Sequence, residues 1–441
     1  MTTLIQHSQS VADQAELYQT KTRAANVMFS KGEVEVVANR KVAACALRVL
    51  KDGRLGSSYA GSADQEELLQ DAVSAAAFGQ AVAFGFAEEQ PVNRTPEPDP
   101  HTAELTVADL LDLCQDVKTR ILRLEPKAVV NMTCRTRAGT RSIETSHGVQ
   151  ISEGSAHAYL GVELPFADRG TDVGAVAEAL SSSPLVIEDP WIEQLVEKRA
   201  WGAQASVPAS GRLPVLLAPG ASNLLTMALL VCLDSRAVAA GLSPLADRVE
   251  QQILDTKLTL RENPLDEQLA AKRSFDDEGI ACRPRTIIDQ GVLKGFLADL
   301  NSRSMLEQDA AGNAARRTMF SENIEDVPMP CFLGAVLEPG KTSWRRLLND
   351  LDEGILVTRT MGLHSSNLLQ GQYAVQALGF HIRNGKPVGY LERTMLSGNV
   401  FEDFLNIRSI SSEREPTRQE MLSVAGVAPY ILLDSAQVTV G

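Results

Sequence analysis

"ANVMFSKGEVEVVANRKVAACALRVLKDGRLGSSYAG", residues 25–61, decides the fold of the first part of the chain. Apolar and polar residues alternate along it, and Lys31-Gly32 and Asp52-Gly53 interrupt the alternation. A period of two is typical of strands, and a glycine-containing pair between two such runs is typical of a tight turn. The stretch therefore predicts a meander of antiparallel strands.

Helical patterns flank this meander. Residues 8–19 and 64–84 carry apolar residues at helical spacing, and the second stretch has an acidic first turn, which favours a helix N-terminus. Residues 106–126 form another amphipathic pattern, which begins at Thr106 and ends before Pro126. These three stretches predict helices.

A second alternating stretch covers residues 128–164, with turn signals at Ala138-Gly139 and His147-Gly148. Residues 188–205 then give a further helical pattern that leads into the rest of the chain. Two rounds of sheet and helix predict an α+β layer in which helices cover one face of the sheet. We expect this N-terminal α/β domain, with helices packed on a mixed or antiparallel sheet, to span residues 1–205.

The pattern changes from residue 211 onward. Short apolar strands, glycines and turn residues dominate, and Asn384-Gly385 between two such strands is a strong hairpin signal. We expect residues 206–441 to form a β-rich C-terminal domain, a sandwich or a barrel-like closed sheet. The fold class predicted for the whole chain is α+β.

Composition excludes several classes of protein. The 441 residues carry a net charge of −14, and the densest basic spots are two adjacent arginine pairs, at residues 316–317 and 345–346. An acidic surface repels phosphate backbones, so we expect no nucleic-acid partner. The chain has no apolar window of the ~18–20 residues that a membrane span needs and no N-terminal signal pattern. The six scattered cysteines, without a CxxC pair, favour reduced thiols in a cytoplasmic protein.

Motif searches give no catalytic signature. None of the six histidines lies four residues from another, and HExxH, GxSxG, GxGxxG and a P-loop are all missing from the sequence. A cysteine nucleophile stays open, although no cysteine has a basic or helix-start setting that would activate it.

"FDDEG", residues 275–279, is the remaining polar motif. In one interpretation Asp276, Asp277 and Glu278 cap backbone amides at a turn that Gly279 completes. In the other they bind a divalent cation, which needs more oxygen or nitrogen ligands from elsewhere in the chain.

A series of motifs in the second half resembles the TldD/PmbA family, the so-called modulators of DNA gyrase, and within it the PmbA (TldE) branch. The motifs are "FDDEG", "IIDQGVLKGFLADLNSRS" (287–304), "GNAARR" (312–317), "GILVTRTMG" (354–362), "GFHIRNGKPVGYLERTMLSGNVFEDFLNIRSI" (379–410) and the final "VTVG". The resemblance implies a heteromeric zinc-dependent peptidase that acts on unfolded or leader-bearing peptides. In that complex TldD carries HExxxH on a helix and a later cysteine ligand, and TldE lacks both.

This chain departs from the catalytic pattern at the positions that the resemblance assigns to zinc. Counting from "PVLLAPG" (214–220), the ligand slots fall at Met227, Ala228 and Cys232. A thioether is a poor zinc ligand, and a methyl group accepts no proton from water. The tail after "NIRSIS" (406–411) has no cysteine. We interpret the helix as an apolar packing helix, with no catalytic residue and no metal site in this chain.

The sequence therefore predicts a non-catalytic, TldE-like subunit that pairs with a TldD-type subunit, binds extended peptides and has no cofactor of its own. Zinc is expected in the TldD-type partner. Two alternatives stay open, a stand-alone homodimeric peptidase and a gyrase-linked regulatory protein. The residues expected to line the peptide path are Asp276, Asp277, Glu278, Asn301, Arg303 and Asn399.

Overall fold

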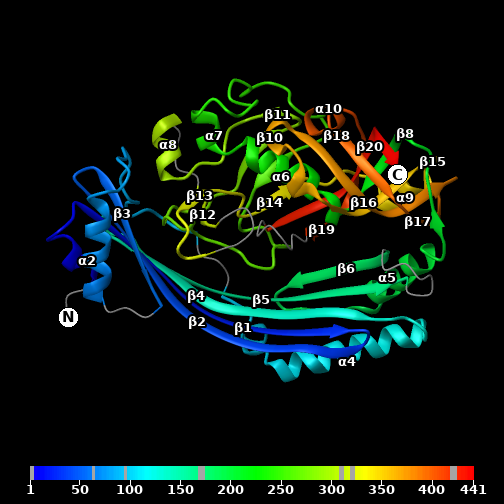
Figure 1. Ribbon diagram of the computed structural model, residues 1–441, viewed down its shortest axis with the longest axis horizontal. Coiled ribbons are helices and arrows are strands. Elements are labelled where there is room, and N and C mark those ends of the chain that lie inside the picture. Colours follow the sequence, from blue (N-terminus) through cyan, green and yellow to red (C-terminus); the bar gives the residue numbers. More distant parts are fainter. Residues whose placement is uncertain are drawn as a thin grey trace.

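The computed structural model describes residues 4–61, 65–93, 97–166, 174–306, 312–317, 323–417 and 425–441. Two sheets dominate it (Figure 1). The first is a curved six-stranded sheet, which lies below the second in Figure 1. The second has twelve strands. The α+β class predicted from the sequence is confirmed.

The first sheet is antiparallel throughout, in the order β3-β2-β1-β4-β5-β6. Its strands are β1 (Gln14–Ser30), β2 (Glu33–Lys51), β3 (Arg54–Ala60), β4 (Asn131–Thr145), β5 (Gln150–Pro165) and β6 (Ala175–Ser182). The turns at Lys31-Gly32 and Asp52-Gly53 join its first three strands as the alternating pattern predicted, because Lys31 and Asp52 adopt positive φ beside their glycines.

Helices cover one face of this sheet. They are α1 (Leu4–Ser8), α2 (Gln65–Ala76), α3 (Pro100–Glu104), α4 (Val107–Leu124) and α5 (Asp189–Trp201). α4 starts where the sequence predicted, because Thr106 and Asp109 form a reciprocal capping box. Its buried stripe packs on Ala25, Val27 and Phe29 of β1. At the other end of the sheet α1 and α2 pack on Leu17 of the same strand.

Two local predictions for this part of the chain are wrong. Residues 8–19 do not form one helix, because Gln14 onward belongs to β1, which is paired on both edges by β2 and β4. Strand pairing overrides a short helical pattern. Ala138-Gly139 is not a turn but the middle of β4. An added Cβ at Gly139 would lie 2.1 Å from the carbonyl oxygen of Lys21, so close backbone approach explains this glycine.

The second sheet is mixed, with the main order β11-β10-β9-β14-β20-β8-β15-β16-β17-β7, while β18 pairs with β16 and β20 and β19 pairs with β20. Its longer strands are β8 (Gly211–Leu217), β10 (Arg285–Asp289), β15 (Glu353–Met361), β16 (Gln372–Arg383), β17 (Lys386–Leu391), β18 (Thr394–Asn399), β19 (Ile407–Thr417) and β20 (Gly426–Val440). The short ones are β7 (Ala205–Ser206), β9 (Leu260–Glu262), β11 (Val292–Leu293) and β14 (Ala335–Leu337). β12 (Ala314–Arg316) and β13 (Pro328–Pro330) form a separate pair.

Short helices pack against the second sheet, and one of them, α6, is buried in its core. They are α6 (Asn223–Cys232), α7 (Ser235–Ala239), α8 (Leu300–Leu306), α9 (Trp344–Asn349) and α10 (Val400–Asp403), with 3₁₀ turns η2 (Pro219–Ala221), η3 (Leu363–Ser365) and η4 (Leu368–Gln370). The hairpin predicted at Asn384-Gly385 is confirmed, since it joins β16 to β17.

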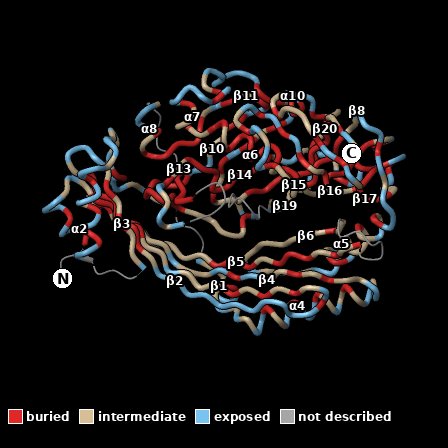
Figure 2. The backbone as a smooth tube through the Cα atoms, viewed as in Figure 1, coloured by how far each residue is buried: buried red, intermediate tan, exposed pale blue. Residues whose placement is uncertain are grey.

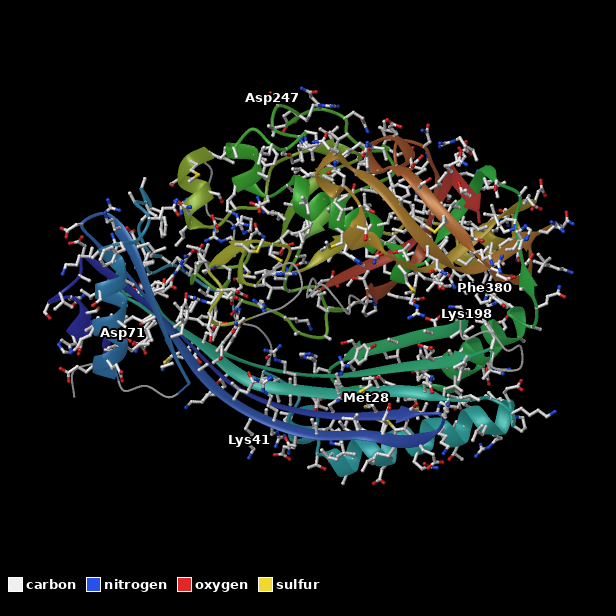
Figure 3. All side chains as sticks on the ribbon, viewed as in Figure 1. Met28, Lys41, Asp71, Lys198, Asp247 and Phe380 are labelled. Carbon is white, nitrogen blue, oxygen red and sulfur yellow. The ribbon has the colours of Figure 1, made fainter. Side chains whose placement is uncertain are left out.

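Burial differs between the two sheets (Figure 2). The strands of the second sheet are buried over long runs, for example Val215, Leu216 and Leu217 of β8, which are each 0% exposed. In the first sheet buried and partly exposed residues alternate along β4. Side chains from both sheets fill much of the space between them, and Phe380 lies beside this junction (Figure 3). Its ring packs edge-on against Trp201 of α5.

The domain division between residues 205 and 206 stays a prediction. No helix in the described ranges is long and apolar enough to cross a membrane.

Candidate functional site

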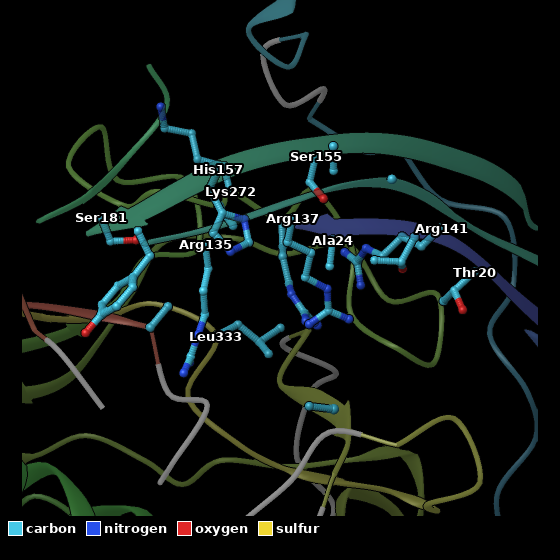
Figure 4. A pocket seen from close by; sticks show the side chains of 18 of the residues that line it. Thr20, Ala24, Arg135, Arg137, Arg141, Ser155, His157, Ser181, Lys272 and Leu333 are labelled. Atoms are coloured by element: carbon cyan, nitrogen blue, oxygen red, sulfur yellow. The ribbon is translucent and has the colours of Figure 1, made fainter. Parts of the chain in front are cut away.

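The main candidate site is a cavity of about 650 Å³ between the two sheets (Figure 4). Its floor consists of residues from β1, β4, β5 and β6 of the first sheet. Residues 271–273, 315–317 and 331–333 of the second half of the chain form the opposite wall. We call this space the basic cavity, for the charges described below.

Strand alternation makes the floor polar. Successive side chains of a strand point to opposite faces, so Met132 and Cys134 of β4 pack toward α4 while Arg135 and Arg137 face the cavity. The same division applies to β1, where Ala25 and its odd-numbered neighbours pack on α4. The even-numbered residues of β1 that line the cavity are Tyr18, Thr20, Thr22, Ala24 and Asn26.

The strand register places these residues in rows across the sheet. One row runs from Asn26 through Arg135 and Tyr159 to Ser181. The next cavity-facing row joins Ala24, Arg137 and His157. The row of Thr22, Gly139 and Ser155 follows, and after it the row of Thr20, Arg141 and Glu153. Figure 4 shows Arg135, Arg137 and Arg141 side by side on this surface.

Positive charge dominates the described lining although the whole chain carries −14. Among the described residues of the lining, two carry carboxylates, Glu153 and Asp277. Low-dielectric walls of one predominant sign focus the field and raise the local concentration of the opposite charge. The seven cationic side chains are those of Arg135, Arg137, Arg141, Lys272, Arg273, Arg316 and Arg317.

One end of the cavity is closed by a buried charge network built on the FDDEG motif. Asp276 is 1% exposed, and its carboxylate accepts hydrogen bonds from the backbone amides of Glu278, Ile280 and Ala314. Gly279 adopts φ +82°. Of the two interpretations of the motif, Asp276 therefore fits the turn-capping one.

Asp277 lies between the two sheets. Its carboxylate accepts hydrogen bonds from Tyr18 of β1 at 3.2 Å and from Arg141 of β4 at 2.8 Å. Its other oxygen accepts from the backbone amide of Arg316 at 2.8 Å. Arg273 forms an ion pair with it at 3.3 Å. Asp277 thus links the two sheets and also lines the basic cavity.

Glu278 extends the network into β1 and β2. Arg48 of β2 pairs with Glu278 at 3.0 Å and with Glu16 of β1 at 2.6 Å, and Glu16 also pairs with Arg316 at 3.0 Å. The backbone amide of Leu300 donates to the second oxygen of Glu278. These ionic side chains are nearly inaccessible to solvent, so the pairs work at low dielectric.

The pKa values of the motif reflect burial. Burial raises the pKa of Asp276 to about 7 and that of Glu278 to about 8, the latter against the attraction of Arg48. Burial would raise the pKa of Asp277 too, but Arg273 and Arg141 outweigh it and hold that pKa below its ordinary value. The ion pairs of the network join four carboxyl groups, those of Glu16, Glu153, Asp277 and Glu278, to four guanidinium groups, those of Arg48, Arg141, Arg273 and Arg316. The partners of the Asp276 carboxyl group are backbone amides, and its burial favours the protonated form near neutral pH.

Of the six residues predicted to line a peptide path, Asp277 lines the basic cavity. Asn301 and Arg303 lie on α8, and Asn399 caps α10, accepting from the backbone amide of Phe401 and donating to the carbonyl of Gln370. Asp276 and Glu278 are buried behind the lining. A path role for these six residues stays a prediction.

The zinc positions implied by the family resemblance do not fit the metal. Met227, Ala228 and Cys232 lie on α6 and are 2%, 0% and 0% exposed, packed in the core of the second sheet. Burial raises the pKa of Cys232 to about 12, so its thiol is protonated at neutral pH. Within the described ranges, no group of three or more His, Cys, Asp or Glu residues is placed to hold a metal ion.

The cysteines also lack the features of a nucleophile. All six are buried and free of disulfides. Cys331 lines the basic cavity, where Arg317 donates to its sulfur, but burial raises its pKa to about 11. A thiol with that pKa is a weak nucleophile at neutral pH.

One hydrogen-bonded row has the residue types of a hydrolase triad. Ser206 Oγ lies 2.8 Å from Nδ1 of His381, and Nε2 of His381 lies 2.6 Å from Glu353. Ser206 lies on β7, His381 on β16 and Glu353 on β15, with β17 between β7 and β16, and His381 is 1% exposed. An added Cβ at Gly389 would lie 2.8 Å from the Cβ of Ser206, which shows how crowded the serine is. We interpret the row as a clamp between strands.

The sequence prediction missed the arginines of the floor. The signal was present in "CRTRAGTR", residues 134–141, where arginines at 135, 137 and 141 share one face of a strand. A search for adjacent basic residues overlooks such a pattern because the alternation separates the arginines along the chain. The pair at 316–317 was noted, and both of its arginines line the cavity.

Comparisons of this chain with known proteins agree on one family. A family model described as PmbA/TldA metallopeptidase C-terminal domain matches residues 210–440, and one described as PmbA/TldA metallopeptidase domain 1 matches residues 15–78. The chain is 22% identical to Metalloprotease PmbA of Escherichia coli O157:H7 over 426 residues, 94% of this chain and 91% of the relative.

Two further comparisons agree. The chain is 28% identical to the Zinc metalloprotease TldD homolog of Saccharolobus solfataricus over 211 residues, 48% of this chain and 46% of that protein. Its fold matches the crystal structure of TldE from Thermococcus kodakarensis with a TM-score of 0.91 at 22% identity, over 99% of both chains.

Proposed function

Since this chain belongs to the PmbA/TldD metallopeptidase family, we propose that it is a non-catalytic, TldE-like subunit of a zinc-dependent peptidase. In this proposal a TldD-type partner holds the zinc and cleaves the peptide. The present chain shapes the space that the peptide occupies and holds the peptide in an extended form.

The chemistry of α6 carries the proposal. Where the family resemblance implies a metal-binding helix, this chain has a thioether, a methyl group and a protonated thiol, all in the core. These groups neither bind zinc strongly nor accept a proton from an attacking water. A chain with such a helix contributes to proteolysis through binding.

The basic cavity and its edge strand support a peptide-holding role. β6 is the last strand of the first sheet, and its residues 179–181 line the basic cavity. Residues 175–178 of β6 line a second cavity of about 240 Å³. An extended peptide beside β6 would pass from one cavity to the other. Backbone hydrogen bonds to an edge strand bind extended peptides with little dependence on side chains.

The same features favour unfolded substrates. Cavities of these volumes admit an extended segment but no folded domain, and the net charge of −14 opposes a nucleic-acid partner. The six free, buried cysteines favour a reducing compartment, in keeping with a cytoplasmic complex. The stand-alone peptidase is less well supported, because burial raises the pKa of the cavity cysteine, Cys331, to about 11.

Reconstitution tests the proposal. The chain is purified alone, its bound metal is measured, and cleavage of an unfolded peptide is followed with and without a TldD-type protein. We expect neither stoichiometric zinc nor cleavage from the chain alone, and cleavage when the partner is added. Stoichiometric zinc together with cleavage by the chain alone would overturn the proposal.

A blocking variant tests the role of the cavity within the complex. Ala24 points into the basic cavity, so Ala24→Trp fills part of the floor (Figure 4). We expect it to reduce partner-dependent cleavage while the complex still assembles. The matched control is Val36→Trp on the exposed part of β2, which should leave cleavage unchanged. Equal cleavage by both variants would remove the basic cavity from the peptide path.

A further inference from the structure

We infer that the second cavity is a subsite that binds one large apolar side chain of the peptide. This inference rests on the proposed peptide-holding function and names the class of side chain that the site favours. It follows from the lining of the second cavity, from the charges around it and from its position at the edge of β6.

The lining of the second cavity is mainly apolar. Its larger apolar and aromatic side chains are those of Phe166, Val176, Leu378, Phe380, Tyr390 and Leu391. Leu378 of β16 is partly exposed, and the other five are buried. Water in such a space finds few hydrogen-bonding partners on the walls, so its replacement by an apolar group is favourable.

Aromatic contacts fix the shape of the second cavity. The rings of Phe166 and Tyr390 stack with their centroids 4.9 Å apart, and the ring of Phe380 lies edge-on to Trp201 at 5.4 Å. These contacts join the first sheet and its helix α5 to β16 and β17. A side chain that enters a cavity with walls already packed in this way binds without the cost of ordering them.

Charges around the second cavity compensate one another, in contrast to the basic cavity. Glu178 of β6 pairs with Lys198 of α5, which is 1% exposed (Figure 3). Glu392 and Arg393, which also line the second cavity, are adjacent and of opposite sign. A charged side chain would lose hydration here without meeting an excess of the opposite charge, so a neutral apolar side chain is favoured.

The second cavity lies at the outer edge of β6. Residues 175–178 are consecutive and all line it, although their side chains alternate between the two faces of the sheet, so the cavity borders the edge of the strand. β5 pairs with the inner edge of β6, and in the described part of the chain no strand pairs with the outer one.

A peptide strand that adds to this edge would therefore be the direct neighbour of the second cavity. Figure 1 shows β6 as the strand of the first sheet that faces the second sheet. Residues of β16 and β17 form the opposite wall of the second cavity. A peptide side chain directed toward that wall would enter the space between β6 and these two strands.

One side chain of a bound peptide is the occupant that this position favours. Residues 179–181 of β6 line the basic cavity, so a peptide paired with residues 175–181 spans both cavities. The second cavity has a volume of about 240 Å³, against about 650 Å³ for the basic cavity. The smaller space admits a side chain while the backbone stays paired with the edge strand.

Isothermal titration calorimetry with the full-length chain tests the inference. The probes are short unstructured peptides of serine and glutamine with one central guest residue, which is leucine, alanine, aspartate or lysine. A host peptide held through its backbone can pair in any register, so the guest can reach the second cavity. We expect the leucine guest to bind about tenfold more tightly than the alanine guest, and the aspartate guest no more tightly than alanine.

Two results would overturn the inference at this stage. Equal affinities for the leucine and alanine guests would show that no apolar subsite exists. A lysine guest that binds more tightly than leucine would show that charge, and not apolar surface, decides which side chain is taken.

Variants on one strand locate the subsite. Ala177→Trp fills the second cavity, so affinities for the leucine and alanine guests should come within about twofold of each other. The matched variant is Ala179→Trp, two residues along the same face of β6, where the side chain lines the basic cavity. It should keep the leucine preference whatever its effect on overall affinity.

A second variant changes the wall without filling the space. Leu378→Gln makes a partly exposed position of the lining polar, and we expect the leucine preference to fall to about threefold. Circular dichroism checks that each variant is folded. A full leucine preference in folded Ala177→Trp and Leu378→Gln proteins would overturn the assignment to the second cavity.

The outcomes separate this inference from the proposed function. Binding of every peptide with equal affinity overturns the subsite alone, whereas failure of every peptide to bind overturns the peptide-holding function as well. A leucine preference that survives Ala177→Trp but is lost in Ala24→Trp would move the subsite to the basic cavity and so overturn the inference.

Discussion

Two charged regions meet along the inner face of β4, and they differ in burial and in partners. Arg141, at one end, belongs to a buried network whose carboxylates pair with it. Arg135, six residues earlier on the same face, is exposed to the basic cavity and donates a hydrogen bond to the neutral Asn26. At one end of β4 an arginine thus helps to bind the two sheets together. At the other end an arginine faces the cavity.

The difference shows that burial, more than residue type, decides what a charge does. A buried ion without its partner costs several kcal/mol, so the network has to be internally paired. An exposed guanidinium keeps much of its hydration and needs no fixed carboxylate. Charge in the network should therefore govern stability, and charge on the floor should govern binding.

The network gives the largest expected effect. Arg48→Met leaves Glu16 and Glu278 buried with one cation fewer, because Arg48 pairs with both. We expect the free energy of unfolding to fall by about 3–5 kcal/mol, measured by urea denaturation followed by circular dichroism.

The control is Arg40→Met on the exposed part of the same strand, which should change the free energy of unfolding by less than about 0.5 kcal/mol. Equal losses in Arg48→Met and Arg40→Met would contradict a cohesive role for the network.

The pH dependence of stability gives the next effect. The folded pKa values of Asp276 and Glu278, about 7 and 8, exceed the ordinary values of 3.8 and 4.5, so the folded chain retains protons that the unfolded chain has released. Stability from these groups is therefore fully present below the ordinary values and is lost as pH rises through 7 and 8. We expect the free energy of unfolding to fall by roughly 1–3 kcal/mol between about pH 5 and pH 8.

Asp276→Asn should flatten this slope, because it removes one of the groups responsible. Glu262 and Glu415, whose pKa values burial also raises to about 7, will keep part of the slope in the variant. Urea denaturation across the pH range measures the slope for both proteins. A wild-type free energy of unfolding that rises with pH over this interval would refute the assignment.

The Ser206–His381–Glu353 clamp should have a smaller effect. Ser206→Ala leaves Nδ1 of the buried His381 without its hydroxyl, and we expect a loss of about 1 kcal/mol in the free energy of unfolding. Partner-dependent peptide cleavage should be unchanged, because the row is a structural clamp.

Ser74→Ala, at an exposed serine of α2, is the matched control and should cost less than Ser206→Ala. Loss of cleavage in a folded Ser206→Ala protein would instead assign the row to catalysis.

The floor should give the smallest effect on stability. Arg135 is exposed and its hydrogen-bond partner is the neutral Asn26, so Arg135→Gln should change the free energy of unfolding by less than about 0.5 kcal/mol. Thermal and urea unfolding of this variant beside Arg48→Met measures the contrast directly. A loss as large as that of Arg48→Met would show that floor and network are one structural unit.

The sequence predicted local elements well where the stabilising interactions join residues that are close together in the chain. The helix start at Thr106, which a capping box with Asp109 stabilises, and the hairpin at Asn384-Gly385 each depend on residues a few positions apart. Gly139 was misread as a turn because its reason is the carbonyl of Lys21 on a neighbouring strand, which no local pattern reveals. Residues 8–19 were misread because β1 gains its stability from pairing with β2 and β4.

Some features of the candidate site could likewise be predicted from the sequence, and others could not. The unsuitability of Met227, Ala228 and Cys232 as a zinc site follows from side-chain chemistry, so the sequence was sufficient. The side-chain partners of Asp277 include Tyr18, Arg141 and Arg273, and the first two are more than a hundred residues away in the chain. No spacing in the sequence indicates contacts between residues so far apart.

By itself, the sequence determined the fold class, the two alternating meanders, the family resemblance and the lack of zinc-binding chemistry on one helix, because each of these depends on residue type and on short-range period. Only the tertiary structure decided that FDDEG joins the two sheets, and that arginines separated along β4 form the floor of one cavity. Those outcomes depend on which distant strands pack together, and on whether packing excludes water from a charged side chain or leaves it exposed.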